Sequence, residues 1–147
     1  MVIDKRNIQD FAGGGFRPHG EVELWAEGPV MRVIATGPFN REAVLALGKA
    51  VHDLYQELGP DRPFCELVEY RGSLLASPEA LTTLSDLLAL MTKIGTAQKA
   101  VALVVAGEVE ARDLMLPMVC KVYAENGRNV ASFETVAAGR AWLNTLL

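Results

Sequence analysis

Residues 66–88, ELVEYRGSLLASPEALTTLSDLL, join a strand pattern to a helix pattern and decide the fold. The first part is short and mostly apolar, as in a buried strand. Apolar residues then recur at helical spacing, which predicts a helix from Pro78 to about Ile94. At the junction, serine suits a helix cap, proline the first helical position, and glutamate the positive end of the dipole. Ser77 is therefore interpreted as a cap, with a regulatory hydroxyl as the alternative.

The sequence on either side alternates between strand and helix patterns. Residues 21–35 predict a β-hairpin with Gly28-Pro29 at its turn. Asn40 and Thr135 are predicted helix caps, and Pro117 should lie near the start of its helix or kink it. The elements after the hairpin are predicted as a helix at 40–59, a strand at 63–70, a helix at 78–94, a strand at 99–106, a helix at 113–127, a strand at 129–135 and a helix at 135–147.

This order, ββαβαβαβα, predicts an α/β fold. The sheet should be mixed but mainly parallel and five-stranded, with the N-terminal hairpin as an antiparallel edge and four helices. The nearly continuous apolar run at 99–106 predicts a central strand. Residues 1–20 are rich in glycine and are expected to form an arm packed on the domain, and residues 21–147 are expected to form a single α/β domain.

Composition excludes several classes of function. The chain of 147 residues has a formal net charge of −4 and no cluster of Lys or Arg, which argues against nucleic-acid binding. Its longest apolar stretch, 100–107, is far shorter than the roughly 20 residues of a transmembrane helix, and its charged start is unlike a secretory signal. A cytoplasmic location is therefore expected. Cys65 and Cys120 are interpreted as reduced, buried thiols, with a redox pair as the alternative.

The sequence shows no arrangement typical of catalysis. His19 and His52 are its only histidines, and neither has a partner at metal-ligand spacing, so no metal or cofactor is predicted. There is no G-x-S-x-G nucleophile motif. Glu66 and Glu69 are three residues apart on a strand, so they should point to opposite faces and not act as a carboxylate pair. An enzyme is the least favoured interpretation.

The candidate binding residues lie in loops and on one helix. Ligands of open parallel sheets bind beyond the carboxyl ends of the strands, which favours the loops after the strands at 63–70 and 99–106. The alternative is that these loop residues are simply solvated. The helix at 78–94 is apolar over a wider arc than one sheet contact needs, so it predicts a surface for a homodimer or an apolar ligand. The candidates are Arg71, Ser73, Ser77, Leu90, Glu108 and Glu110.

Three stretches carry a resemblance to a known family: PFCELVEYRGSLLASPEAL at 63–81, AVALVVAG at 100–107 and SFETVAAGRAWL at 132–143. With the order of elements, they resemble the STAS or anti-sigma-factor-antagonist (SpoIIAA-like) superfamily, nearest its bacterial STAS/SEC14-like branch. The resemblance implies a protein that is not an enzyme and that binds a partner protein, or sometimes a nucleotide or lipid. It also places Ser77 where relatives carry a phosphorylated serine, although the aspartate of their Asp-Ser-Ser-Gly-Leu-type motif is absent here.

Two functions follow as hypotheses. The first is a non-catalytic regulatory or scaffold module that binds a partner protein. The second is a carrier or sensor of a lipid or other small apolar ligand held between helices and sheet. Apolar residues beyond the needs of a core, such as Leu90, Leu116 and Leu146, would support the second function.

Overall fold

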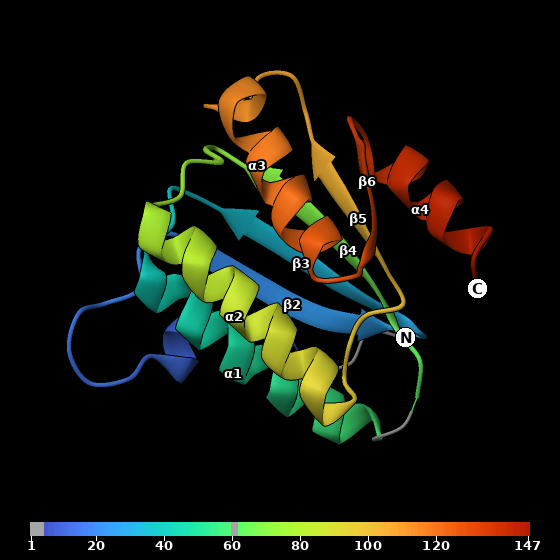
Figure 1. The fold of residues 1–147 in the computed structure, drawn as a ribbon, viewed down its shortest axis with the longest axis horizontal. Coiled ribbons are helices and arrows are strands. Elements are labelled where there is room, and N and C mark those ends of the chain that lie inside the picture. Colours follow the sequence, from blue (N-terminus) through green and yellow to red (C-terminus); the bar gives the residue numbers. More distant parts are fainter. Residues whose placement is uncertain (1–4, 60–61) are drawn as a thin grey trace.

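The computed structural model describes residues 5–59 and 62–147, and within them the chain forms one six-stranded sheet with helices on both faces (Figure 1). No helix of this described part is long and apolar enough to cross a membrane. The elements are β1 Arg6–Asn7, the 3-10 helix η1 Ile8–Phe11, β2 Glu21–Glu27, β3 Val30–Thr36, α1 Arg41–Leu58, β4 Cys65–Arg71, α2 Pro78–Ile94, β5 Ala100–Val105, α3 Arg112–Glu125, β6 Asn129–Phe133 and α4 Val136–Asn144.

The strands lie in the sheet in the same order as in the sequence, β1-β2-β3-β4-β5-β6. The strand β2 is antiparallel to both of its neighbours, β1 and β3, and β3 to β6 are parallel. The predicted α/β class, hairpin and four helices are confirmed. The sheet has one strand more than the five expected, because Arg6–Asn7 of the arm pairs with β2. The strand is short, and the fully buried Ile8 follows it at once.

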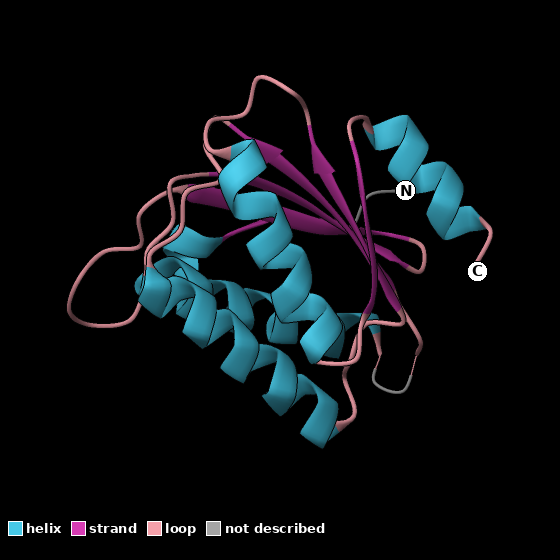
Figure 2. Cartoon of the chain, turned by 45° about the horizontal axis from the view of Figure 1, so that its top comes forward, coloured by secondary structure: helices cyan, strands magenta, loops and turns pink. Residues whose placement is uncertain are grey.

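Three helices, α1, α2 and α3, cover one face of the sheet, and α4 covers part of the other (Figure 2). This follows from the strand order. Each parallel crossover moves to the next strand in the same direction, and crossovers share one hand, so their helices lie on the same side. α4 follows the last strand and packs on β4, β5 and β6. The larger hydrophobic core therefore lies under the three helices, and a smaller one lies under α4.

The strand β5 lies between β4 and β6, and all its residues are buried, as its apolar run predicted. The sheet also separates the two thiols. Cys65 belongs to the core under α4, whereas Cys120 packs against the core under the three helices. Both are free cysteines, and because they lie on opposite faces they do not form a redox pair.

The three predicted helix caps are present. The side chains of Asn40, Ser77 and Thr135 accept hydrogen bonds from backbone N–H groups three residues on, and for Ser77 the distance from Ala80 N is 3.1 Å. The helix of Pro117 begins at Arg112, one residue before the expected start, and contains the proline. The predicted end of α1 at Gly59-Pro60 falls partly outside the described residues. Gly59 is its C-cap.

We expect Ser77→Ala to lower the free energy of unfolding by about 1 kcal/mol, because the N–H of Ala80 loses its acceptor. Ser77→Asp should retain stability, since aspartate also caps and suits the helix dipole. Urea unfolding of the three proteins measures both effects. An alanine variant with full stability would contradict the capping role.

Candidate functional site

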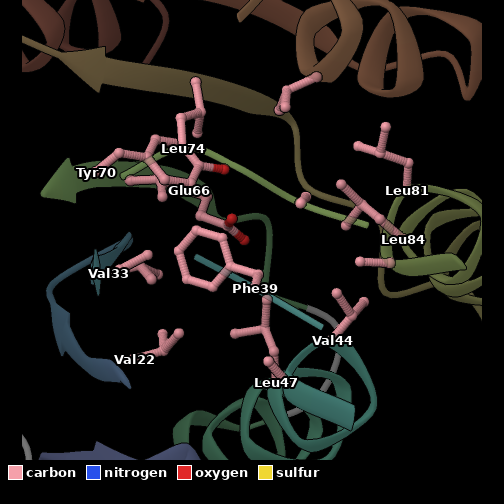
Figure 3. A pocket seen from close by; sticks show the side chains of 16 residues that line it. Val22, Val33, Phe39, Val44, Leu47, Glu66, Tyr70, Leu74, Leu81 and Leu84 are labelled. Atoms are coloured by element: carbon pink, nitrogen blue, oxygen red, sulfur yellow. The ribbon is translucent and has the colours of Figure 1, made fainter. Parts of the chain in front are cut away.

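An apolar cavity of about 70 Å³ lies between the sheet and helices α1 and α2 (Figure 3). Val22 and Val33 contribute from β2 and β3, and Leu84 contributes from α2. The rings of Phe39 and Tyr70 meet edge to face with centroids 6.1 Å apart and form part of the wall. The lining is therefore almost wholly hydrocarbon, as is typical of sites for small ligands.

The cavity exists because small side chains line it at several points. Ala35 comes from β3, Ala43 from the first turn of α1, Ala76 from the loop before α2, and Ala80 from the first turn of α2. A methyl group at each of these positions does not fill the space that a longer apolar side chain would occupy. The cavity therefore depends on small residues in the sequence, most of them near the starts of α1 and α2.

Glu66 is the charged residue that lines this cavity. Only 5% of its surface is exposed, and Figure 3 shows its carboxyl group directed into the pocket. Its Oε2 accepts a hydrogen bond from Gln98 Nε2 at 3.0 Å. Within the described part of the chain, Oε1 has no hydrogen-bond partner. Gln98 thus holds one oxygen of a carboxyl group that points into the cavity, and the other oxygen is left to bond to a ligand.

A chain of buried hydrogen bonds holds Glu66 in place. Gln98 Oε1 accepts from Arg128 Nε at 2.8 Å, and because arginine only donates, the amide of Gln98 must present its N–H groups to Glu66. Arg128 also donates to Thr92 Oγ1 and to the carbonyl of Leu88, both on α2. The carboxyl group is therefore positioned through β4, the segment before β5, the residue before β6 and helix α2.

The surroundings of Glu66 favour its neutral form. Burial raises its pKa because the carboxylate loses solvation, and the hydrogen bond from Gln98 and the charge of Arg128 offset this only in part. The same environment raises the pKa of Tyr70 and Tyr123, through burial and the nearby Glu66 carboxylate. The site thus holds weak acids whose protonated forms are favoured.

Glu66 is not among the site residues that the sequence predicted. It did predict that Glu66 and Glu69 face opposite sides of the sheet, and this is confirmed. Glu69 lies on the other face, where it accepts hydrogen bonds from Arg32 at 2.5 Å and Arg71 at 2.9 Å. The alternation of side chains along the strand could have indicated its burial, because it places Glu66 on the same face as Val68 and Tyr70, which the helices cover.

Ser73 and Glu110 are brought together, but as a structural pair. The Ser73 hydroxyl donates to Glu110 Oε1 at 2.8 Å, and it accepts from the backbone N–H of Leu75. Only 5% of Ser73 is exposed, so the interpretation of a solvated loop serine is wrong. Backbone hydrogen bonds join the same loops, from Leu74 N to Glu110 O and from Glu110 N to Gly72 O. The pair therefore ties the loop after β4 to the loop after β5.

The other predicted residues do not converge on one site. Arg71 and Glu108 both line a shallow hollow of about 430 Å³ near the ends of β4 and β5, together with Glu134 and Thr135. Ser77 caps α2, and Leu90 lies farther along the same helix. The strand order explains this dispersal. Ligands collect at strand ends where the sheet order reverses, and this sheet does not reverse.

A second hollow, a groove of about 590 Å³, runs between α1 and α2. Leu87 and Met91 are among the residues that line it, and Leu45, Leu90 and Ile94 line it with 41%, 52% and 52% of their surfaces exposed. Of the three leucines expected to exceed the needs of the core, Leu116 is buried and Leu146 is partly buried. Of these three leucines, Leu90 is the exposed one.

No protein family matches the sequence, no curated protein matches it, and no solved structure matches the fold. Across residues 5–59 and 62–147, no group of three or more His, Cys, Asp or Glu side chains is placed to hold a metal ion. The chemistry of the cavity is therefore the observation from which a function can be argued.

We expect the stability of Glu66→Gln relative to the wild type to increase with pH. The folded-state pKa of Glu66 is raised above its ordinary value of 4.5, so its contribution to stability is full below that value and is lost as pH rises through the folded-state pKa. Glutamine cannot ionise and has nearly the same shape. Urea unfolding across a pH series tests this, with Glu108→Gln, at an exposed position, as the control. A stability difference that is the same at every pH would contradict the buried, neutral carboxyl group.

Proposed function

We propose that the chain is a non-catalytic binding module that takes a small apolar ligand into the cavity between α1, α2 and the sheet. The supporting observation is an apolar space with one buried carboxyl group directed into it. Ligand sites are typically apolar, with a few polar groups that fix the orientation of the ligand. Glu66 supplies such a group, and Phe39 and Leu84 are among the side chains that supply the apolar surface.

The dimensions favour a small molecule. About 10–15 Å³ of such space is enough for one water molecule, so about 70 Å³ has room for a compact organic molecule. A long acyl chain would require α1 and α2 to separate. Their close approach at Gly48 opposes this, since a Cβ there would lie 2.9 Å from Leu87 Cδ1. A compact ligand is thus favoured over a lipid.

The chemistry of the lining supports binding over catalysis. Among the described residues, no histidine, cysteine, lysine or serine lines the cavity. Glu66 therefore has no nucleophile beside it to activate, and Gln98 and Arg128 position it without taking its proton. A group that is held by hydrogen bonds and faces an apolar space can orient a ligand, which is the role we assign to it.

The relation to the STAS superfamily remains a proposal that rests on the three sequence stretches and on the order of elements. A cytoplasmic location is proposed with it, because the chain carries two free cysteines, of which Cys65 is buried. If the chain is related to this superfamily, we expect that a module which senses a ligand also binds a partner protein.

Partner binding is the second candidate function, favoured by the exposed apolar side chains along the groove between α1 and α2. We name Leu45, Leu90 and Ile94 the α1/α2 face. Exposed apolar patches of this kind are commonly covered by another chain. A second copy is the occupant we propose, because closed two-fold pairs are the commonest assemblies of soluble chains.

We expect Ala80→Leu to abolish binding of xenon in the cavity, because the longer side chain fills it. Ala138→Leu is the matched control. Both alanines occupy the third position of a helix, and both N–H groups bond to a capping side chain, but Ala138 is exposed. Methyl NMR under xenon pressure should show shifts for Val22 and Leu84 in the wild type and the control only. Ala80→Val fills less space and serves if leucine prevents folding. Xenon shifts that persist in folded Ala80→Leu would contradict the cavity assignment.

For the α1/α2 face, we expect the wild type to sediment as a dimer and Leu90→Glu as a folded monomer. Leu90 is exposed in the single chain, so the substitution should not disturb the core, but it places a charge in the proposed contact. Glu79→Gln on the same helix changes an exposed charge without touching this face. A monomeric wild type at micromolar concentration would rule out the self-association.

A further inference from the structure

We propose that Glu66 binds an uncharged ligand that carries one hydrogen-bond acceptor, such as a carbonyl oxygen, on a compact apolar body. This inference rests on the proposed ligand-binding function and names the chemical class that the cavity would select. Three features carry it: the direction of the hydrogen bonds that reach Glu66, the side chains that line the cavity, and the shape of its wall.

The direction of the hydrogen bonds fixes the role of each carboxyl oxygen. Arg128 donates to Gln98, so Gln98 must donate to Glu66 Oε2, and that oxygen acts as an acceptor. When Glu66 carries a proton, the proton therefore belongs on Oε1. Figure 3 shows the carboxyl group directed into the cavity, and Oε1 has no hydrogen bond to any described residue. The carboxyl group thus offers one O–H donor to whatever occupies the space.

The lining disfavours charged ligands. Within residues 5–59 and 62–147, no lysine, arginine or histidine lines the cavity, so an anionic ligand would find no cation there and would face a carboxyl group. Arg128 directs its hydrogen bonds to Gln98, Thr92 and two backbone carbonyls, of Leu88 and Asn126. A cationic ligand would require an ionised Glu66, which burial disfavours. An uncharged ligand requires neither.

The remaining contacts are apolar and favour a compact body. The rings of Phe39 and Tyr70, at a 70° interplanar angle, form part of the wall. Val33, Val68 and Leu47 are among the other side chains that line the space. A second polar group on the ligand would be left without a partner against these surfaces, at a cost of roughly 1–3 kcal/mol. One acceptor on a small ring or branched skeleton is therefore the matching chemistry.

Three probes of the same ring size separate the possibilities: cyclopentanone, cyclopentylammonium and cyclopentane. Methyl NMR titrations of the wild type measure the affinity of each, below and above the pH at which Glu66 ionises. We expect cyclopentanone to bind up to about tenfold more tightly than cyclopentane at the lower pH, the value of one net hydrogen bond. This preference should disappear as Glu66 ionises and loses its O–H group.

Two variants isolate the donor. Glu66→Gln accepts from Gln98 and directs an N–H group into the cavity, so it should prefer cyclopentanone at every pH. Glu66→Met has no donor, so the carbonyl of cyclopentanone would lose its hydration without a replacement hydrogen bond, and this variant should bind cyclopentanone more weakly than cyclopentane. Glu108→Gln, at an exposed position outside the cavity, should behave as the wild type.

The outcomes distinguish this inference from the proposed function. Equal binding of cyclopentanone and cyclopentane by the wild type at the lower pH would overturn the role of Glu66 and leave the apolar site in place. A preference for cyclopentylammonium that Glu66→Gln abolishes would overturn the uncharged class of ligand. Failure of all three probes to bind, at either pH, would reject both the ligand-binding function and the inference.

Discussion

The position of each helix depends on one topological constraint: every parallel crossover steps to the next strand in the same direction. Crossovers of one hand then place α1, α2 and α3 on a single face. The helix α4 alone remains for the other face, and it covers β4, β5 and β6. The opposite faces of β4 consequently differ in chemistry. Glu69 lies with Arg32 and Arg71 on one face, and Glu66 lies under the helices on the other.

A buried carboxyl group in such a core must be held by hydrogen bonds, and the chain from Arg128 through Gln98 to Glu66 provides them. The same arginine bonds to Thr92 and to the carbonyl of Leu88 on α2. The position of α2 and the position of the Glu66 carboxyl group are therefore coupled. A ligand that hydrogen-bonds to Glu66 would therefore bind to a side chain that is linked to α2 by hydrogen bonds through Gln98 and Arg128. Arg128 sets the direction of these bonds, because arginine only donates.

The sequence predicted those parts of the fold that depend on local pattern. The hairpin and the caps at Asn40, Ser77 and Thr135 each depend on a few neighbouring residues. The strand β1 was not predicted, because two residues are too few to show a periodic pattern. Its formation depends instead on pairing with β2. The contact between Ser73 and Glu110 joins loops distant in sequence. The cavity depends on how α1 and α2 sit on the sheet, so the alanines that line it could be recognised only in three dimensions.

The sequential order of the strands also bears on how the molecule forms. Each strand of the sheet pairs with the strand next to it in the chain, from β1 to β6. No strand has to wait for a distant partner, so the loops that must close are short for a parallel sheet, and their entropic cost is correspondingly low. A chain emerging from the ribosome can add one strand at a time to the growing edge, with each new helix covering the strands already paired. Assembly can therefore proceed in the direction of synthesis.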